Sequence, residues 1–172
     1  MLLLTSVHFF SALQKYIRRL NALFFCRKGH PTGRIRLSGI CYRLPTEAEW
    51  EWAVRAGTKT AYFFGNDSSQ LGRYAIYGKN SIGTRAVKGD RSPNPWGLYD
   101  VYGNVWEWVQ DAWQRELPGK KDPLVTTGSN RVVRGGSWSN DARSLRSAFR
   151  HDGHPNYGNY RVGFRLVRTR NP

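Results

Sequence analysis

The chain has 172 residues, with 27 Lys and Arg against 12 Asp and Glu, which gives a formal net charge of +15. Residues 1–46 carry eight basic side chains and no acidic one, and residues 131–172 carry nine against two, so a neutral middle separates two basic ends and argues against a uniformly basic scaffold of the histone kind. Arginine outnumbers lysine by 20 to 7, beside seven Trp, nine Tyr and eight Phe. Because arginine stacks on aromatic rings and no RNA- or DNA-reading motif is present, we expect a loop-rich fold and no specific nucleic-acid partner.

The first residues do not match a membrane or secretion signal. No apolar run reaches 18 residues, which predicts no membrane span. The run MLLLTSVHFFSAL has no positive charge before it and three basic residues after it, the reverse of a signal peptide, so the compartment, cytoplasmic or exported, stays open. The two cysteines, Cys26 and Cys41, fit no metal-binding spacing, and a single disulfide between them stays an open alternative.

An amphipathic helix is the first element expected. Residues 9–24 place the basic Lys15, Arg18 and Arg19 on one face. The apolar side chains fall near the other face: Phe9, Leu13, Tyr16, Ile17, Leu20, Leu23 and Phe24. Residues 25–41 are interrupted by glycine and proline and show no clear period, which indicates an irregular insertion.

A second helix is predicted over residues 46–56. Thr46 precedes Glu49 by three residues, which is the spacing of a capping box. Arg55 and Gly57 then supply the basic last turn and the glycine that commonly end a helix.

The rest of the chain predicts short strands between irregular loops. From residue 58 to 137, Gly, Asn, Asp, Ser and Pro recur every few residues between aromatic side chains. Residues 103–109 alternate only weakly between apolar and polar types, whereas residues 131–134 and 163–168 alternate clearly and are predicted strands. The expected fold class is α+β with little regular secondary structure.

Four stretches, in this order, resemble the formylglycine-generating enzyme, or sulfatase-modifying factor, family: YRLPTEAEWEWAVRAG (42–57), NPWGLYDVYGNVWEW (94–108), RVVRGGSWS (131–139) and RSAFR…VGFRLVR (146–168). The resemblance covers residues 11–168 and implies a C-type-lectin-like fold with a small twisted sheet and much irregular loop. It implies a sulfatase-modifying-factor-like domain over residues 42–172, preceded by an atypical segment over 1–41 that holds the first helix and the insertion. Because the family's domain begins well before that helix, we expect a copy truncated at its N-terminus.

The resemblance also implies an activity, the oxidation of a substrate cysteine to formylglycine with copper and a cysteine pair. Copper(I) needs soft thiolate ligands, but no cysteine follows Cys41, and residues near Asn140 and Leu145 fill the positions of the pair. A related branch, the iron-dependent sulfoxide synthases, takes most of its iron ligands from a helical domain with no counterpart in this sequence, and His151 and His154 lack further ligands. We therefore expect no copper and no formylglycine-generating activity. An oxidoreductase that acts on sulfatase cysteines stays an alternative.

Calcium is the cofactor that the resemblance favours. Carried over residue by residue, Asp100 and Glu107 would give side-chain oxygens, and Gly103 and Val105 would give backbone carbonyl oxygens. Mixed oxygen ligands from one short loop are what Ca²⁺ accepts. The open alternative is that Asp100 and Glu107 cap turns and pair with nearby arginines.

The segment 139–161 supplies the expected ligand-binding surface. Its residues are of the types that antibody loops use, rigid aromatic anchors and adaptable hydrogen-bonding groups. The expected ligand-binding residues are Ser139, Asn140, Asp141, Ser144, His151, Asp152, His154, Tyr157, Asn159 and Tyr160.

This sequence therefore favours a noncatalytic module that binds a protein or a small polar ligand through the loop 139–161. The pattern also resembles the variable region of diversity-generating-retroelement proteins on the same fold, so a retroelement variable protein is an alternative. The oligomeric state stays open.

Overall fold

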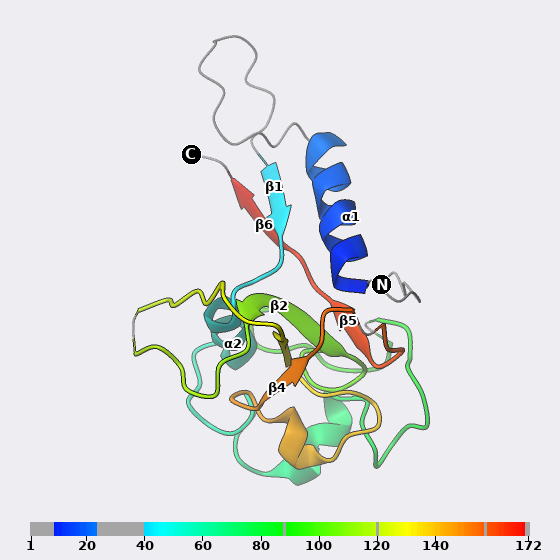
Figure 1. Cartoon of the computed structure of the whole chain (residues 1–172). Helices are drawn as coiled ribbons and strands as arrows, with labels where there is room; N and C mark the ends of the chain where they lie inside the picture. The colour runs from blue at the N-terminus through cyan, green and yellow to red at the C-terminus, as the bar shows by residue number, and fades with distance from the viewer. Residues whose placement is uncertain (1–8, 24–39, 88, 120, 157, 171–172) are drawn as a thin grey trace, which may run out of the picture.

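The computed structural model describes residues 9–23, 40–87, 89–119, 121–156 and 158–170. Short helices and strands are joined by long loops (Figure 1), so the predicted α+β class with little regular secondary structure is confirmed. With η marking a 3-10 helix, the elements are α1 Phe9–Leu23, β1 Ile40–Arg43, α2 Glu47–Arg55, η1 Ser68–Arg73, β2 Trp106–Ala112, β3 Arg131–Arg134, η2 Ala142–Leu145, β4 Arg150–Gly153, β5 Val162–Phe164 and β6 Val167–Arg170.

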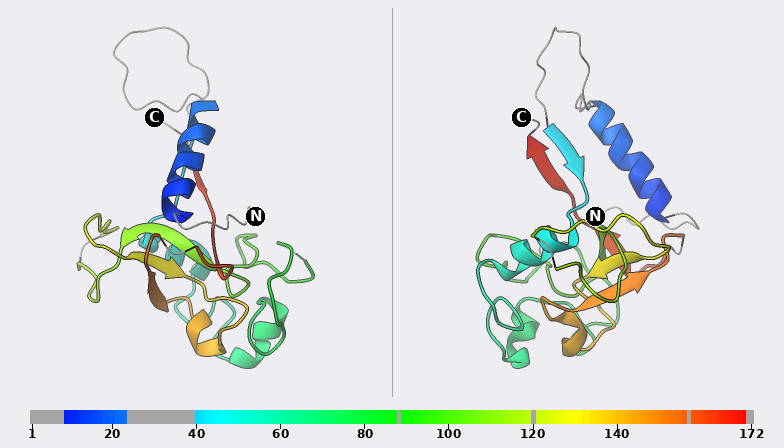
Figure 2. Two further views of the ribbon diagram at one scale, coloured as in Figure 1. Left: turned by 45° about the vertical axis from the view of Figure 1, so that its right-hand side comes forward. Right: turned by 60° about the vertical axis from the view of Figure 1, so that its left-hand side comes forward.

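The strands form two separate sheets. Four strands lie in the order β4-β3-β2-β5, in which β3 is antiparallel to both neighbours and β5 runs parallel to β2. The other two, β1 and β6, make an antiparallel ribbon that extends beyond the four-stranded sheet beside α1 (Figure 2). Asn21 of α1 binds the backbone of β1 on the edge that does not pair with β6. Its side chain donates to the Tyr42 carbonyl at 2.8 Å and accepts from the Tyr42 N–H at 2.7 Å.

The four-stranded sheet has an apolar cluster on each face. Alternation along β2 sends Trp106 and Trp108 to one face, where Leu13 and Ile17 of α1 pack on them. Val109 of β2 belongs to the other cluster, which α2 and the loops complete. The sheet is therefore covered on both faces. Because Leu13 and Ile17 share an apolar cluster with Trp106 and Trp108, α1 packs as part of the same domain.

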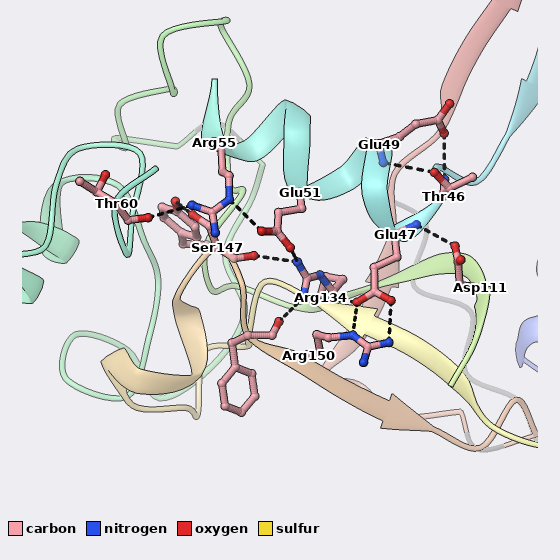
Figure 3. Close-up of polar contacts among 12 residues, drawn as sticks. Thr46, Glu47, Glu49, Glu51, Arg55, Thr60, Asp111, Arg134, Ser147 and Arg150 are labelled. Atoms are coloured by element: carbon pink, nitrogen blue, oxygen red, sulfur yellow. Dashed lines mark hydrogen bonds and ion pairs between the residues drawn. The ribbon is translucent and has the colours of Figure 1, made fainter. Parts of the chain in front are cut away.

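The start of α2 confirms the predicted capping box (Figure 3). The Thr46 hydroxyl accepts from the Glu49 N–H at 3.1 Å, and the Glu49 carboxylate accepts from the Thr46 N–H at 2.8 Å. Arg43 orients the same carboxylate through two hydrogen bonds of 2.6 Å. At the other end Ala56 adopts the left-handed conformation that often ends a helix.

One strand prediction needs correction, and one strand lies where the sequence pattern is weak. The continuous strand expected over residues 163–168 is two strands, because the chain leaves the four-stranded sheet after β5 and joins β1 as β6. Arg165, between them, turns its side chain to Glu107 of β2 instead of continuing the ladder. The weakly alternating residues 103–109 contain the start of β2, whose pattern is weak because both of its faces are covered.

The N-terminal third contains both described and undescribed residues. The expected boundary between residues 41 and 42 falls inside β1, and residues 24–39, the core of the expected insertion, lie outside the described residues. Cys41 is disulfide-bonded. Cys26 lies outside the described residues. Within the described part of the chain, no helix is long and apolar enough to cross a membrane.

Candidate functional site

A cavity of about 260 Å³ opens where the end of β4 meets the turn after β3. Ser137, Ser139 and Asn140 come from the turn, and the remaining polar residues come from β4 and the chain after it. Six of the ten predicted ligand-binding residues line this cavity: Ser139, Asn140, His151, Asp152, His154 and Asn159. The structure thus brings together residues that are up to 20 positions apart in sequence.

The sheet supplies an apolar wall to the cavity. Trp108, Val133 and His151 lie side by side across β2, β3 and β4, and all three line it. Gly153 also lines it, and a Cβ atom there would lie 2.7 Å from the Trp108 ring, so glycine is needed for the ring to occupy its place. The imidazole of His151 meets Trp106 edge-on with 5.3 Å between ring centres.

Several polar side chains of the cavity are already oriented by neighbours. The Asn140 side-chain oxygen accepts from the Ser137 N–H at 2.9 Å and from its hydroxyl at 2.6 Å. The Asp152 carboxylate accepts from Asn130 at 2.5 Å and also lies 3.4 Å from Nδ1 of His151. These bonds fix the rim of the cavity before any ligand is present.

Four predicted residues are not among those that line the cavity. Asp141 caps η2, because its carboxylate accepts from the N–H and the hydroxyl of Ser144, so these two residues stabilise a turn. Tyr160 is 56% exposed and stacks on Trp138. Tyr157 lies outside the described residues.

Arg161 lines the cavity and was not predicted. Its guanidinium lies 5.3 Å from the ring centre of Trp138 and 5.1 Å from that of Tyr160, and Nη2 donates to the Tyr160 hydroxyl at 2.9 Å. The signal available in the sequence was its place at the end of the polar loop, directly before the first residue of β5. The wall residues Trp106 and Trp108 were also missed, although their spacing of two places them on one face of a strand.

Two arginines, Arg134 and the partly exposed Arg150, fix β3 and β4 beside the cavity (Figure 3). Arg134 of β3 is fully buried, lies 2.5 Å from the Glu51 carboxylate and donates to two backbone carbonyl groups. Burial lowers the pKa of Arg134, although the attraction of Glu51 and Glu47 opposes this. Arg150 of β4 bonds both oxygens of Glu47, at 2.5 and 2.8 Å. Since His151 follows Arg150, this pairing positions the strand that carries the rim.

The four residues predicted to hold calcium line a second cavity, of about 210 Å³, together with Arg165. Gly103 takes a positive φ there, and a Cβ atom on it would lie 2.0 Å from the Ile76 carbonyl oxygen, so this position needs glycine.

Arg165 stands where the predicted calcium ligands meet. It donates to both oxygens of Glu107 at 2.6 Å, and Trp50 donates to one of them at 2.7 Å. Burial opposes the charge of Arg165, but the attraction of Glu107 and the hydrogen bonds to it outweigh this and raise the pKa of Arg165. The Glu107 carboxylate is thus paired with a guanidinium, as the arginine alternative expects, and the calcium site stays a prediction. Within the described residues no three His, Cys, Asp or Glu side chains come together as a metal site.

Comparison with known proteins agrees with this architecture. The profile of the sulfatase-modifying factor enzyme 1-like domain matches residues 4–170. The formylglycine-generating enzyme of Thermomonospora curvata is 36% identical over 115 residues, which are 56% of this chain and 38% of that protein. The inactive Cα-formylglycine-generating enzyme 2 of Mus musculus is 33% identical over 140 residues, 73% of this chain and 42% of that protein.

A solved structure supports the same assignment. Treponema denticola variable protein 1 aligns with a TM-score of 0.69 and 40% identity over 76% of this chain and 48% of that one. The chain spans between 21% and 38% of the length of the first curated relatives it matches. The fold predicted from the resemblance is confirmed, and the chain belongs to the sulfatase-modifying factor, or formylglycine-generating enzyme, family.

Proposed function

We propose that this chain is a noncatalytic binding module of its family, which holds a protein segment or a small polar ligand in the cavity beside β4. The observation that carries this proposal is the convergence of six predicted polar residues on one cavity with a rigid apolar wall. Ligand sites commonly combine such a wall with a few oriented polar groups.

The residues at the positions of the family's cysteine pair support a noncatalytic role. Asn140 is engaged in the turn with Ser137, and Leu145 is fully buried in the apolar cluster behind the sheet. Neither side chain offers a thiolate for Cu(I). The name of the mouse relative also indicates that inactive members occur in this family.

A retroelement variable protein is the second candidate. It is supported by the likeness to Treponema denticola variable protein 1, which is named as a variable protein and is 40% identical to this chain where the two align. In that case residues that line the cavity would differ between copies of the gene, whereas Arg134 and Arg150 would not. Sequencing the gene in many isolates, together with a search for a neighbouring reverse transcriptase, tests this candidate. The segment 139–161, expected as one loop, contains η2 and β4. A segment 139–161 that is invariant across isolates would contradict this candidate.

The binding proposal is tested by blocking the cavity. Ser139 is exposed on the rim, so Ser139→Tyr should fill the mouth without disturbing the core. Ser68→Tyr makes the same change at an exposed position in η1 and is the matched control. Both variants and the parent are applied to peptide and glycan arrays. We expect array partners of the parent to be kept by Ser68→Tyr and lost by Ser139→Tyr. Partners that Ser139→Tyr retains would place binding elsewhere on the chain.

A further inference from the structure

The chemistry of the cavity indicates the kind of group it binds, an inference that rests on the proposed binding function. We propose that the cavity takes a carboxylate of its ligand, and that the Arg161 guanidinium is the group that binds it.

Arg161 is held in one orientation before a ligand arrives. Trp138 and Tyr160 lie within 5.3 Å of its guanidinium carbon, and the Tyr160 hydroxyl accepts from Nη2 at 2.9 Å. Its own backbone N–H donates to the Asn159 side chain, which fixes the backbone as well. A planar guanidinium fixed in this way loses little conformational entropy when it binds a carboxylate with two parallel hydrogen bonds.

Arg161 also differs from two arginines of the sheet, Arg134 and Arg150, which pack on aromatic rings and are ion-paired. Arg134 lies over Trp50 and pairs with Glu51, and Arg150 lies over Trp113 and pairs with Glu47. Arg161, by contrast, lines the cavity of about 260 Å³ beside β4. It forms no ion pair with any carboxylate in the described part of the chain. Its charge is therefore available to a ligand.

Asp152 is the acidic residue at this cavity, and its position limits its competition for Arg161. In the β3–β4 register Asp152 is opposite Val132, whereas His151 is opposite Val133, so the two side chains start from opposite faces of the strand. The Asp152 carboxylate is bound by Asn130 at 2.5 Å. It is therefore already occupied at the edge of the sheet.

The surroundings favour a carboxylate on a small apolar body. One guanidinium balances one negative charge, whereas a phosphate near −2 would leave charge uncompensated. The wall formed by Trp106, Trp108 and Val133 offers apolar contact beside that charge. An acidic side chain or a chain terminus of a partner protein, or a small organic acid, meets this description.

The experiment compares benzoate with benzamide, which have nearly the same shape and differ in charge. Indole N–H resonances of the full-length, ¹⁵N-labelled protein are followed by NMR during titration, since Trp106 and Trp108 line the cavity. We expect benzoate to shift these resonances and benzamide to bind at least about tenfold more weakly, because a charge-assisted hydrogen bond is lost. Arg161→Gln should weaken benzoate binding by a similar factor. Arg168→Gln, which removes an exposed charge from β6, should leave it unchanged.

Tyr160→Phe keeps the stacked ring and removes the hydroxyl bonded to Nη2, so it tests the same arginine without removing it. We expect a partial loss of benzoate affinity. Equal binding of benzoate and benzamide, or benzoate binding that Arg161→Gln leaves unchanged, would overturn the carboxylate inference while the cavity remains a binding site. Loss of array partners by Ser139→Tyr is independent of this result, so the two proposals fail separately. Absence of any benzoate shift at its solubility limit would also overturn the inference.

Discussion

Replacement of Arg134 by Met should cost more stability than any other single change in the network between α2 and the sheet. Arg134 is fully buried, and its removal leaves Glu51 with Arg55 alone and two backbone carbonyl oxygens without their donor. Breaking a buried ion pair costs about 3–5 kcal/mol. Because Glu47 keeps Arg150, we expect a value near the lower end, about 3 kcal/mol.

The matched control is Arg55→Met. Arg55 contacts the same Glu51 from the next turn of α2, at 2.8 Å, but the pair is partly exposed, and such helix pairs contribute about 0.3–0.5 kcal/mol. Arg55 also donates to the Thr60 carbonyl at 2.9 Å, a hydrogen bond that adds about 0.5–1.5 kcal/mol, so the expected cost of Arg55→Met stays below that of Arg134→Met. Urea denaturation of both variants measures the two costs directly. For a domain of this size, about 3 kcal/mol also lowers the melting temperature by roughly 10 °C. Equal losses for the two variants would refute the argument that burial, and not the contact itself, sets the cost.

Four further outcomes are expected. Thr46→Ala should lower the free energy of unfolding by about 0.5–2 kcal/mol in urea titrations, since it removes the cap of α2. Burial raises the pKa of Tyr102 from 10.0 to about 12. The unfolded chain therefore loses this proton first, and the free energy of unfolding should fall as the pH rises from 10 to 12. Tyr102→Phe should flatten this part of a plot of urea midpoint against pH. Because Arg165 neutralises Glu107, EDTA should leave the melting temperature unchanged and Arg165→Gln should lower it. A melting temperature that EDTA lowers and Ca²⁺ restores would instead support the calcium prediction. Mass spectrometry of a sulfatase-type cysteine peptide incubated with the protein and copper should detect no formylglycine above a no-protein control.

The prediction of α2 needed only short-range sequence. The capping box, the acidic first turn and the basic last turn involve residues a few positions apart, so their spacing is enough to predict them. The amphipathic face of α1 was predictable for the same reason, and Leu13 and Ile17 are buried as expected, whereas Tyr16 at the border of that face is exposed. By contrast, the break between β5 and β6 depends on which sheet each strand joins, and pairing partners far along the chain leave no local pattern.

The candidate site divides in the same way. The residue types of the segment 139–161, which are those of antibody loops, predicted a polar binding surface, and six of the predicted residues line the cavity. Asp141 and Ser144 have the same composition signal, but their side chains satisfy the N-terminal groups of η2. Composition alone does not distinguish a polar side chain that caps a turn from one that faces a cavity.

Residue identity and local spacing were enough to predict the family and the α+β class, and they show that no cysteine follows Cys41. Three features needed the folded chain: Trp106 and Trp108 form the wall of a cavity, Arg165 neutralises Glu107, and Arg161 lines the cavity without an ion-pair partner among the described residues. Each of these depends on side chains that meet across separate strands and loops. Such contacts are fixed by the packing of the whole domain, which no local pattern records.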